Sequence, residues 1–268
     1  ISLSGCEYED CNIQIINNTF VNLANSIDVY SYRGNITIAK NSIVGACDRG
    51  ISLFDLSGEA GEIAVYENNI SSAGYGMEVS NSQGVLIHSN NITISPYDLC
   101  AGFGYESAGV YISYSEGISL ENNSITILPL GEDANLNPAI TIEETYSSYI
   151  SGNKIYFHHD QDEFELISCW DYGIYGNYLE NNYLYSSKGR GTYVTPCMYT
   201  VNNTLENVGF EVYSSNTNIS SNKIIIHERK YVDPFYFDVD VCNYYDYPFE
   251  DNTVNDLPAL WVGGGKPC

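Results

Sequence analysis

The stretch GVLIHSNNITI, residues 84–94, sets two adjacent asparagines, Asn90 and Asn91, among aliphatic and β-branched side chains. A strand that ran straight through it would bury an amide among isoleucines, which is costly unless the amide is hydrogen-bonded. We therefore predict a bend between two strands at Asn90. We expect Asn90 to point into the protein and Asn91 to face the solvent.

The pattern around Asn90 recurs along the whole chain. Alignment on one asparagine gives ten repeats, spaced 19 to 33 residues apart. Position +2 from this asparagine is apolar in all ten repeats, and position −3 is apolar in nine, with Thr200 as the exception. The aligned residues are Asn18, Asn41, Asn68, Asn90, Asn123, Asn153, Asn182, Asn203, Asn222 and Asn252.

The offsets predict three short strands in each repeat. Positions −5 and −3 alternate inward as in a strand. Position +2 and, in several repeats, position +4 do so with the opposite parity, so a bend falls between the two pairs and contains the asparagine. A further strand precedes both. Its apolar pairs are Met77/Val79, Val110/Ile112, Ile140/Ile142 and Val239/Val241. The prediction is an all-β parallel solenoid of about ten coils, roughly 45–50 Å long at about 4.8 Å per coil.

Two repeats carry a resemblance to known proteins: GMEVSNSQGVLIHSNNITI (76–94) and GVYISYSEGISLENNSITI (109–127). They resemble the parallel β-helix repeat family, the right-handed solenoids that include pectate lyases, NosD-like copper-processing proteins and archaeal surface proteins. The resemblance covers essentially the whole chain. It implies a single-stranded right-handed parallel β-helix with an internal asparagine ladder, as one domain over residues 1–268. Such a fold does not by itself select a function.

Longer segments interrupt the repeats near residues 95–108, 128–138, 156–168 and 227–236. All four fall after the last strand of one repeat and before the first strand of the next, so we expect them to emerge at one corner. In the enzymes of the family, such loops and the outer face of the first strand form the substrate groove.

The outward positions of the first strand form a stripe of acidic and tyrosine side chains. Asp238 and Asp240 are two residues apart, which would set their carboxyl groups about 6–7 Å apart, near the separation used by inverting glycosidases. An ordinary solvated strand face produces such pairs too, so we assign no catalytic residue and keep this pair as the alternative. The expected stripe is Asp28, Tyr30, Glu78, Tyr111, Thr141, Glu143, Glu211, Tyr213, Asp238 and Asp240.

Arginine placement argues against a pectate-lyase-like activity. The enzymes of that group resemble one another in an arginine base beside Ca²⁺-binding aspartates. This chain has four arginines, and we expect none of them among the strand positions of the stripe: Arg33, Arg49, Arg190 and Arg229. The sequence therefore leans away from an enzyme without excluding one.

Metal binding has one weak candidate, the segment FHHDQDE at 157–163, with His158, Asp160 and Asp162 as its ligands. Adjacent histidines alternate faces when extended, so a solvated acidic loop is the competing interpretation. We expect no required cofactor, with Ca²⁺ as the cation that an acidic chain would bind.

Charge limits the partners. The 268 residues contain 10 Lys and Arg against 34 Asp and Glu, a formal charge of −24. Binding to nucleic acid or an anionic membrane requires basic groups, so neither is expected. No apolar run is long enough to span a membrane. The chain opens on ISLSG, which resembles the middle of a strand, so we expect it to derive from a longer precursor.

Cysteines and glycosylation motifs indicate an extracellular protein. Eight scattered cysteines without a C-x-x-C pair predict four disulfides: Cys6, Cys11, Cys47, Cys100, Cys169, Cys197, Cys242 and Cys268. Seven N-x-S/T motifs predict N-glycans at Asn17, Asn35, Asn69, Asn91, Asn122, Asn202 and Asn218.

The leading functional hypothesis is a non-enzymatic extracellular or cell-surface glycoprotein, a subunit of a surface layer or filament that assembles as a homo-oligomer or polymer. The alternative is a carbohydrate-active enzyme or glycan-binding adhesin that uses the acidic and tyrosine stripe.

Overall fold

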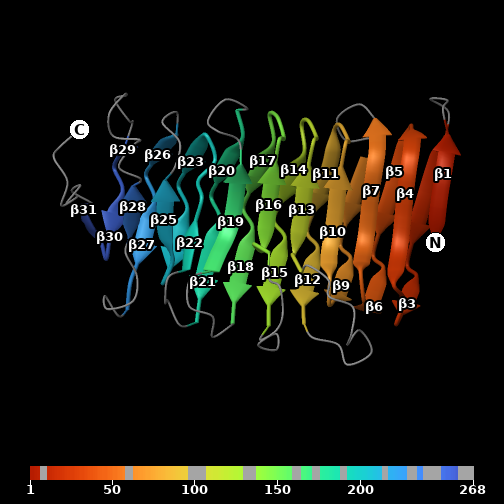
Figure 1. Cartoon of the computed structure of the whole chain (residues 1–268), viewed down its shortest axis with the longest axis horizontal. Helices are drawn as coiled ribbons and strands as arrows, with labels where there is room; N and C mark the ends of the chain where they lie inside the picture. The colour runs from red at the N-terminus through yellow and green to blue at the C-terminus, as the bar shows by residue number, and fades with distance from the viewer. Residues whose placement is uncertain are drawn as a thin grey trace.

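The computed structural model describes residues 1–6, 11–57, 63–95, 107–128, 137–158, 164–170, 176–187, 192–212, 217–227, 234–237 and 249–258. Every regular element in this part of the chain is a β-strand, and the strands form three long sheets (Figure 1). None of these residues forms a helix long and apolar enough to cross a membrane.

Each sheet takes its strands in sequence order, one from each successive coil. The first sheet contains β1 (Ser2–Cys6), β4 (Asn25–Arg33), β7 (Arg49–Ser57), β10 (Tyr75–Ser80), β13 (Val110–Ser113), β16 (Ile140–Glu143), β19 (Phe164–Trp170), β22 (Thr192–Val194), β25 (Gly209–Val212) and β28 (Phe235–Phe237). The second sheet contains β2 (Asn12–Ile16), β5 (Asn35–Ala39), β8 (Ile63–Tyr66), β11 (Val85–His88), β14 (Ser119–Glu121), β17 (Tyr149–Ser151), β20 (Tyr178–Glu180), β23 (Tyr199–Val201), β26 (Asn218–Ser220) and β29 (Phe249–Glu250). The third sheet contains β3 (Thr19–Val21), β6 (Ser42–Ala46), β9 (Asn69–Ser72), β12 (Asn91–Ile94), β15 (Ser124–Ile127), β18 (Lys154–Phe157), β21 (Tyr183–Ser186), β24 (Thr204–Glu206), β27 (Lys223–Ile225), β30 (Thr253–Val254) and β31 (Leu257–Pro258).

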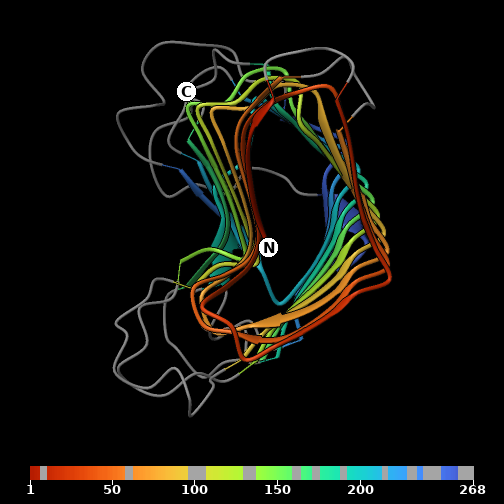
Figure 2. The same cartoon turned by 90° about the vertical axis from the view of Figure 1, so that its right-hand side faces the viewer.

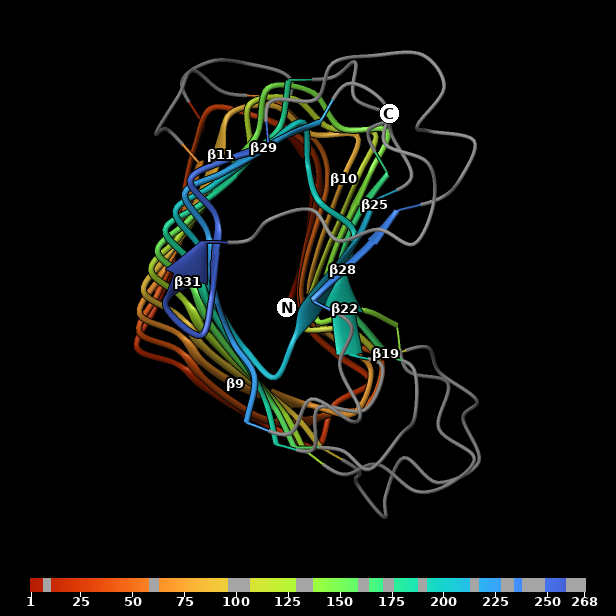
Figure 3. The same ribbon diagram turned by 90° about the vertical axis from the view of Figure 1, so that its left-hand side faces the viewer.

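Each strand pairs in parallel with its equivalents in the neighbouring coils. Strand β11, for example, lies between β8 and β14, and β12 lies between β9 and β15. The last strand, β31, folds back antiparallel to β30. Views along the long axis from the two ends show the strands of each sheet lying over one another (Figures 2 and 3). The protein is therefore a right-handed parallel β-solenoid, as the sequence predicts.

Aliphatic side chains fill the interior, stacked coil upon coil. In the column at position +2 of the repeat, the side chains from Ile43 to Ile224 are fully enclosed, Phe20 is buried and Val254 is partly buried. Each coil thus covers the interior side chains of the coils on both sides of it. Truncating one such isoleucine to alanine is expected to cost about 2–5 kcal/mol.

The ten aligned asparagines form one hydrogen-bonded column, the asparagine ladder, at the bend between the second and third sheets. The backbone N–H and Nδ2 of Asn90 both donate to Oδ1 of Asn123 in the next coil, at 2.9 and 3.0 Å. Nδ2 of Asn90 also donates to the carbonyl oxygen of Val65 in the preceding coil, at 2.9 Å. The paired bonds to Oδ1 recur at every step from Asn18 to Asn252. The buried amides are thus satisfied by one another.

The turn itself is made by the residue before each ladder asparagine. Strand β11 ends at His88, Ser89 adopts a φ of 56°, and β12 begins at Asn91. The sequence predicts a bend that contains Asn90, and the left-handed residue in it is Ser89. All ten equivalent residues have φ between 53° and 67°: Asn17, Lys40, Glu67, Ser89, Asn122, Gly152, Asn181, Asn202, Ser221 and Asp251.

A glycine at the start of the first strand in several repeats has a packing cause. A Cβ added to Gly76 would lie 2.4 Å from Cγ2 of Ile92 and 2.6 Å from the carbonyl oxygen of Gly109. The same conflict recurs one coil further on, where Gly109 lies against Ile125 and Ala139. These glycines allow the first sheet to approach the third sheet closely.

The structure shortens one expected insertion, and a second expected boundary falls outside the described residues. The strand of the first sheet in the last coil is β28 at Phe235–Phe237, where the sequence predicted Val239 and Val241, which lie outside the described residues. The insertion predicted over 156–168 is shorter at both ends, because β18 extends to Phe157 and β19 begins at Phe164. Phe164 and Leu166 are buried, which draws that segment into the first sheet.

Candidate functional site

The described members of the predicted stripe lie on the outer face of the first sheet. Register places Asp28, Glu78, Tyr111 and Thr141 in one row across β4, β7, β10, β13 and β16, with Ser52 and Ser168 in the same row. Tyr30 and Glu143 lie two residues further along their strands, and Glu211 faces outward on β25. Tyr213, Asp238 and Asp240 lie outside the described residues.

A β-bulge in β19 adds a carboxyl group that the sequence did not predict. The register of pairing with β22 shifts between Glu165 and Ile167. Before the shift the odd-numbered side chain faces outward, and after it the even-numbered side chains do. Glu165, Ser168 and Trp170 consequently face outward, although Glu165 and Ser168 are three residues apart. Bulges that redirect a side chain in this way are common beside functional sites.

Glu165 lies in a group of polar side chains that we call the Glu165 cluster: Thr141, Glu165, Ser168 and Glu211. Ser168 is 1% exposed and Thr141 is 9% exposed, although both lie on the outer face of the sheet. Among the described residues, Thr141 Oγ1, Ser168 Oγ and Glu165 Oε1 are buried polar atoms without a hydrogen-bond partner. Native proteins leave few buried polar groups unpaired, so each one calls for an explanation.

The electrostatics of the cluster disfavour ionisation of the Glu165 carboxyl group. Burial raises the pKa of the Glu165 carboxyl above its ordinary value, and the nearby negative charge of Glu211 raises it further. The hydroxyls of Thr195 and Ser168 oppose this shift in pKa. A carboxyl group with a raised pKa beside a second carboxyl group is the arrangement that separates a general acid from a general base.

Tyr111 and Glu143 extend the stripe next to the cluster. Tyr111 Oη donates a 2.5 Å hydrogen bond to Glu143 Oε2 across neighbouring coils. Burial, followed by the Glu143 carboxylate, raises the pKa of Tyr111 well above its usual range. Tyr111 therefore remains a neutral donor at physiological pH.

Two arginines lie at the ends of first-sheet strands, beside the stripe. Arg33 ends β4 and Arg49 begins β7. The guanidinium of Arg49 contacts the Glu78 carboxylate and donates to Asp48 Oδ2 at 3.0 Å. Burial raises the pKa of Asp28, and the positive charge of Arg49 opposes that shift. Arg49 could not be placed from sequence because its side chain reaches the stripe from the edge of the strand.

Tyrosines stack on the outside of the second sheet. The ring centroids of Tyr149 and Tyr178 are 4.6 Å apart with an interplanar angle of 7°, and Tyr178 stacks on Tyr199 at the same distance. In-register tyrosines thus form cross-strand pairs that reinforce the coil stacking.

One disulfide is defined in full, between Cys169 in β19 and Cys197 after β22. Both cysteines are buried in the interior. Cys11 and Cys47 are also disulfide-bonded. The side chain of Cys6 and the residues Cys100, Cys242 and Cys268 lie outside the described part.

Six of the seven sequon asparagines are exposed, and Asn218 is partly buried. Asn69 and Asn91 lie in register on adjacent coils, and Asn91 Nδ2 donates to Asn69 Oδ1 at 2.8 Å. Five of them flank the asparagine ladder along one edge of the solenoid: Asn17, Asn69, Asn91, Asn122 and Asn202.

The predicted metal site is not assembled by the described residues. His158 lies beside Tyr156 and Tyr185, while Asp160 and Asp162 lie outside the described part. No group of three or more His, Cys, Asp or Glu side chains in the described segments is arranged to hold a metal ion.

Comparisons with protein-family models, with curated proteins and with solved structures find no match. The fold defines the class, a right-handed parallel β-solenoid, and the function has to be inferred from the surface of this chain.

Proposed function

We propose that the chain is a non-enzymatic extracellular structural glycoprotein, a subunit of a cell-surface layer or filament. The observation that carries the proposal is the row of five exposed sequons beside the asparagine ladder, with Asn35 and Asn218 elsewhere, at the starts of β5 and β26. Glycans on that edge would leave the other faces of the rod free for contacts between copies. The buried Cys169–Cys197 disulfide supports an oxidising compartment.

Peptide mapping of protein isolated from its native source tests glycosylation. We expect enzymatic removal of N-glycans to convert sequon asparagines along the ladder edge to aspartates. Strands pair about 4.8 Å apart, so Asn69 and Asn91 lie too close for two branched glycans side by side. We therefore expect one of these two sites, not both, to be occupied in any molecule. Peptide maps in which every sequon asparagine is unmodified would refute the glycoprotein proposal.

Electron microscopy of the native material tests assembly. A filament or lattice with the repeat of this rod is the expected result. Monodisperse monomers of the intact glycosylated protein at high concentration would contradict a structural role.

The Glu165 cluster favours a second candidate, a carbohydrate-active site on the first-sheet face. Buried hydroxyls without partners of good geometry beside a carboxyl group with a raised pKa are features that polar ligand sites share. Activity on a polysaccharide panel, compared with the Glu165→Gln and Glu211→Gln variants, tests this candidate. Asp238→Asn and Asp240→Asn test the pair suggested by the sequence. If the protein has no activity, or none of the four variants changes it, the enzyme candidate is excluded.

A further inference from the structure

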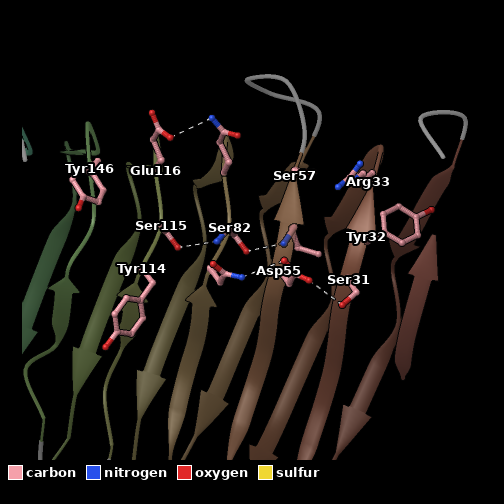
Figure 4. Close-up of a pocket in the computed structure, with 13 residues that line it drawn as sticks. Ser31, Tyr32, Arg33, Asp55, Ser57, Ser82, Tyr114, Ser115, Glu116 and Tyr146 are labelled. Atoms are coloured by element: carbon pink, nitrogen blue, oxygen red, sulfur yellow. Dashed lines mark hydrogen bonds between the residues drawn. The ribbon is translucent and has the colours of Figure 1, made fainter. Parts of the chain in front are cut away.

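A groove of about 850 Å³ runs along the bend between the first and second sheets (Figure 4). It spans five adjacent coils, from the end of β4 to Tyr146 after β16. At about 4.8 Å per coil, the first and fifth coils are roughly 20 Å apart. The groove lies at a different corner from both the asparagine ladder and the Glu165 cluster.

Two exposed columns and one buried column build the groove. The first rim consists of left-handed residues with φ between 48° and 55°: Ser31, Asp55, Asn81 and Tyr114. The second rim lies two residues later in each coil, in register: Arg33, Ser57, Gln83, Glu116 and Tyr146. The floor between them is buried: Tyr32, Leu56, Ser82 and Ser115.

The floor is closed by internal bonds, so binding would use the rims. The backbone N–H of Leu56 donates to Ser82 Oγ at 3.2 Å, and that of Ser82 donates to Ser115 Oγ at 3.1 Å. Ser82 and Ser115 in turn donate to backbone carbonyl oxygens. The floor is thus a second polar column, which the sequence did not predict.

The rims change character along the axis. Carboxylate, amide and hydroxyl groups occupy the middle coils, where Asp55 accepts bonds from Ser31 and Asn81 at 3.1 and 3.2 Å. Two tyrosines face solvent at one end, on opposite rims of neighbouring coils (Figure 4). Tyr114 is 56% exposed and Tyr146 is 47% exposed.

The backbone conformation of Tyr114 indicates that the first rim has a role besides forming the bend. Its φ of 48° is costly for a bulky side chain, by about 1–2 kcal/mol, whereas Asn81 at the equivalent position tolerates that conformation. A ring that is mostly exposed contributes little to the packing that would offset this cost. Backbone strain kept at an exposed aromatic residue is typical of a binding surface.

We infer that this groove binds a linear, uncharged oligosaccharide lying along the solenoid axis. A pyranose ring offers C–H groups to the negative face of an aromatic ring and hydroxyls to amides and carboxylates, which are the groups on the two rims. Because the rims repeat with the coils, they suit a polymer with a repeat of similar length. The formal charge of −24 disfavours polyuronates and nucleic acids. This binding does not depend on whether the chain assembles.

Calorimetric titration of the full chain with cellohexaose, xylohexaose, mannohexaose and chitohexaose tests the inference. We expect at least one of them to bind, with affinity that rises up to about four or five sugar units, the length of the groove. Hexagalacturonate is the charged control and should not bind. The inference would be overturned if none of the four neutral hexasaccharides bound. It would also be overturned if the only ligands that bound were branched N-glycans released from the protein.

Tyr114→Asn and Phe54→Ala distinguish the groove from other exposed aromatic residues. Asparagine accepts the left-handed conformation, so Tyr114→Asn should fold at least as stably as the parent and lose about tenfold in affinity. Phe54 is 49% exposed on the first sheet outside the groove, and Phe54→Ala should bind as the parent does. Equal affinities of Tyr114→Asn and the parent, or an equal loss in both variants, would place the ligand elsewhere.

Discussion

The asparagine ladder and the Glu165 cluster both enclose polar side chains, but only the ladder pairs them. From Asn41 to Asn222, each ladder amide bonds to the next coil and to the preceding one, whereas the cluster holds buried oxygens of Thr141, Glu165 and Ser168 without partners of good geometry. The ladder repeats one residue type through the molecule, and the cluster occurs once, at a bulge. Polar groups that recur in every coil and are hydrogen-bonded stabilise the fold. Buried polar groups that lack partners and occur at one bulge indicate a role other than stability.

The largest effect is expected in the ladder. Asn123→Ala removes the acceptor for two bonds from Asn90 and the donor to Asn153, which leaves buried groups unpaired. We expect the free energy of unfolding to fall by about 3 to 4 kcal/mol, measured by urea denaturation of unglycosylated protein. Asn122→Ala is the matched control, exposed and one residue away, with a loss of about 1 kcal/mol. Equal losses in the two variants would show that the hydrogen bonds of the ladder contribute no more to stability than an exposed asparagine does.

Removal of the Cys169–Cys197 disulfide tests whether this bond stabilises the bulged strand β19. Cys169 adjoins Ser168 in β19, and its bond to Cys197 closes a segment with a sequence separation of 28 residues. The double variant Cys169→Ala/Cys197→Ala should lose about 3 kcal/mol of unfolding free energy. A double variant as stable as the parent in urea denaturation would mean that packing alone holds the bulged strand.

Glu165→Gln should stabilise the protein at neutral pH. Burial raises the pKa of Glu165 in the folded state, so the unfolded chain ionises first as pH rises above about 4.3. Stability is lost through the window between the unfolded and folded pKa values and stays lower above it. The variant lacks this loss and should gain about 1 kcal/mol at pH 7. A pH–stability profile identical to that of the parent would show that Glu165 is solvated.

The smallest effect is expected from Ser168→Ala. Its Oγ lies near the Glu165 carboxyl group, whose raised pKa it opposes, but it makes no hydrogen bond of good geometry, so removing it should change the unfolding free energy by less than about 0.5 kcal/mol. Thermal unfolding of the variant beside Asn123→Ala measures the contrast directly. A loss comparable to that of Asn123→Ala would mean that Ser168 is paired in solution and would remove the difference between the two clusters.

The sequence predicted the solenoid because its signal repeats. Ten asparagines with an apolar residue two positions later define the bend, the interior column and the strand parity at once. The left-handed column escaped prediction because residues as different as Lys40 and Glu67 share that backbone conformation with asparagine. The residue before each ladder asparagine adopts the left-handed conformation whatever its type, because the hydrogen bonds of the ladder fix the position of the asparagine that follows it.

The Glu165 cluster could not be predicted from the same signal. A period of two through β19 would set Glu165 and Ser168 on opposite faces, and only the bulge brings them to one face. The alternation in FELIS was a usable sign of a strand, but the acidic residues before it favoured a loop. Sites that occur once lack the repetition that makes a repeat readable.

The ladder also gives the rod a direction. In every step from Asn18 to Asn252, the backbone N–H and one Nδ2 N–H point toward the later coil and Oδ1 points toward the earlier one, while Nδ2 from Asn41 onward also donates to a carbonyl oxygen of the preceding coil. The side-chain dipoles therefore add along the axis and polarise one another. Turning a single amide over would set donor against donor on one side and acceptor against acceptor on the other. The hydrogen bonds between neighbouring amides thus fix the same amide orientation in every coil, and the column carries one net dipole along the axis.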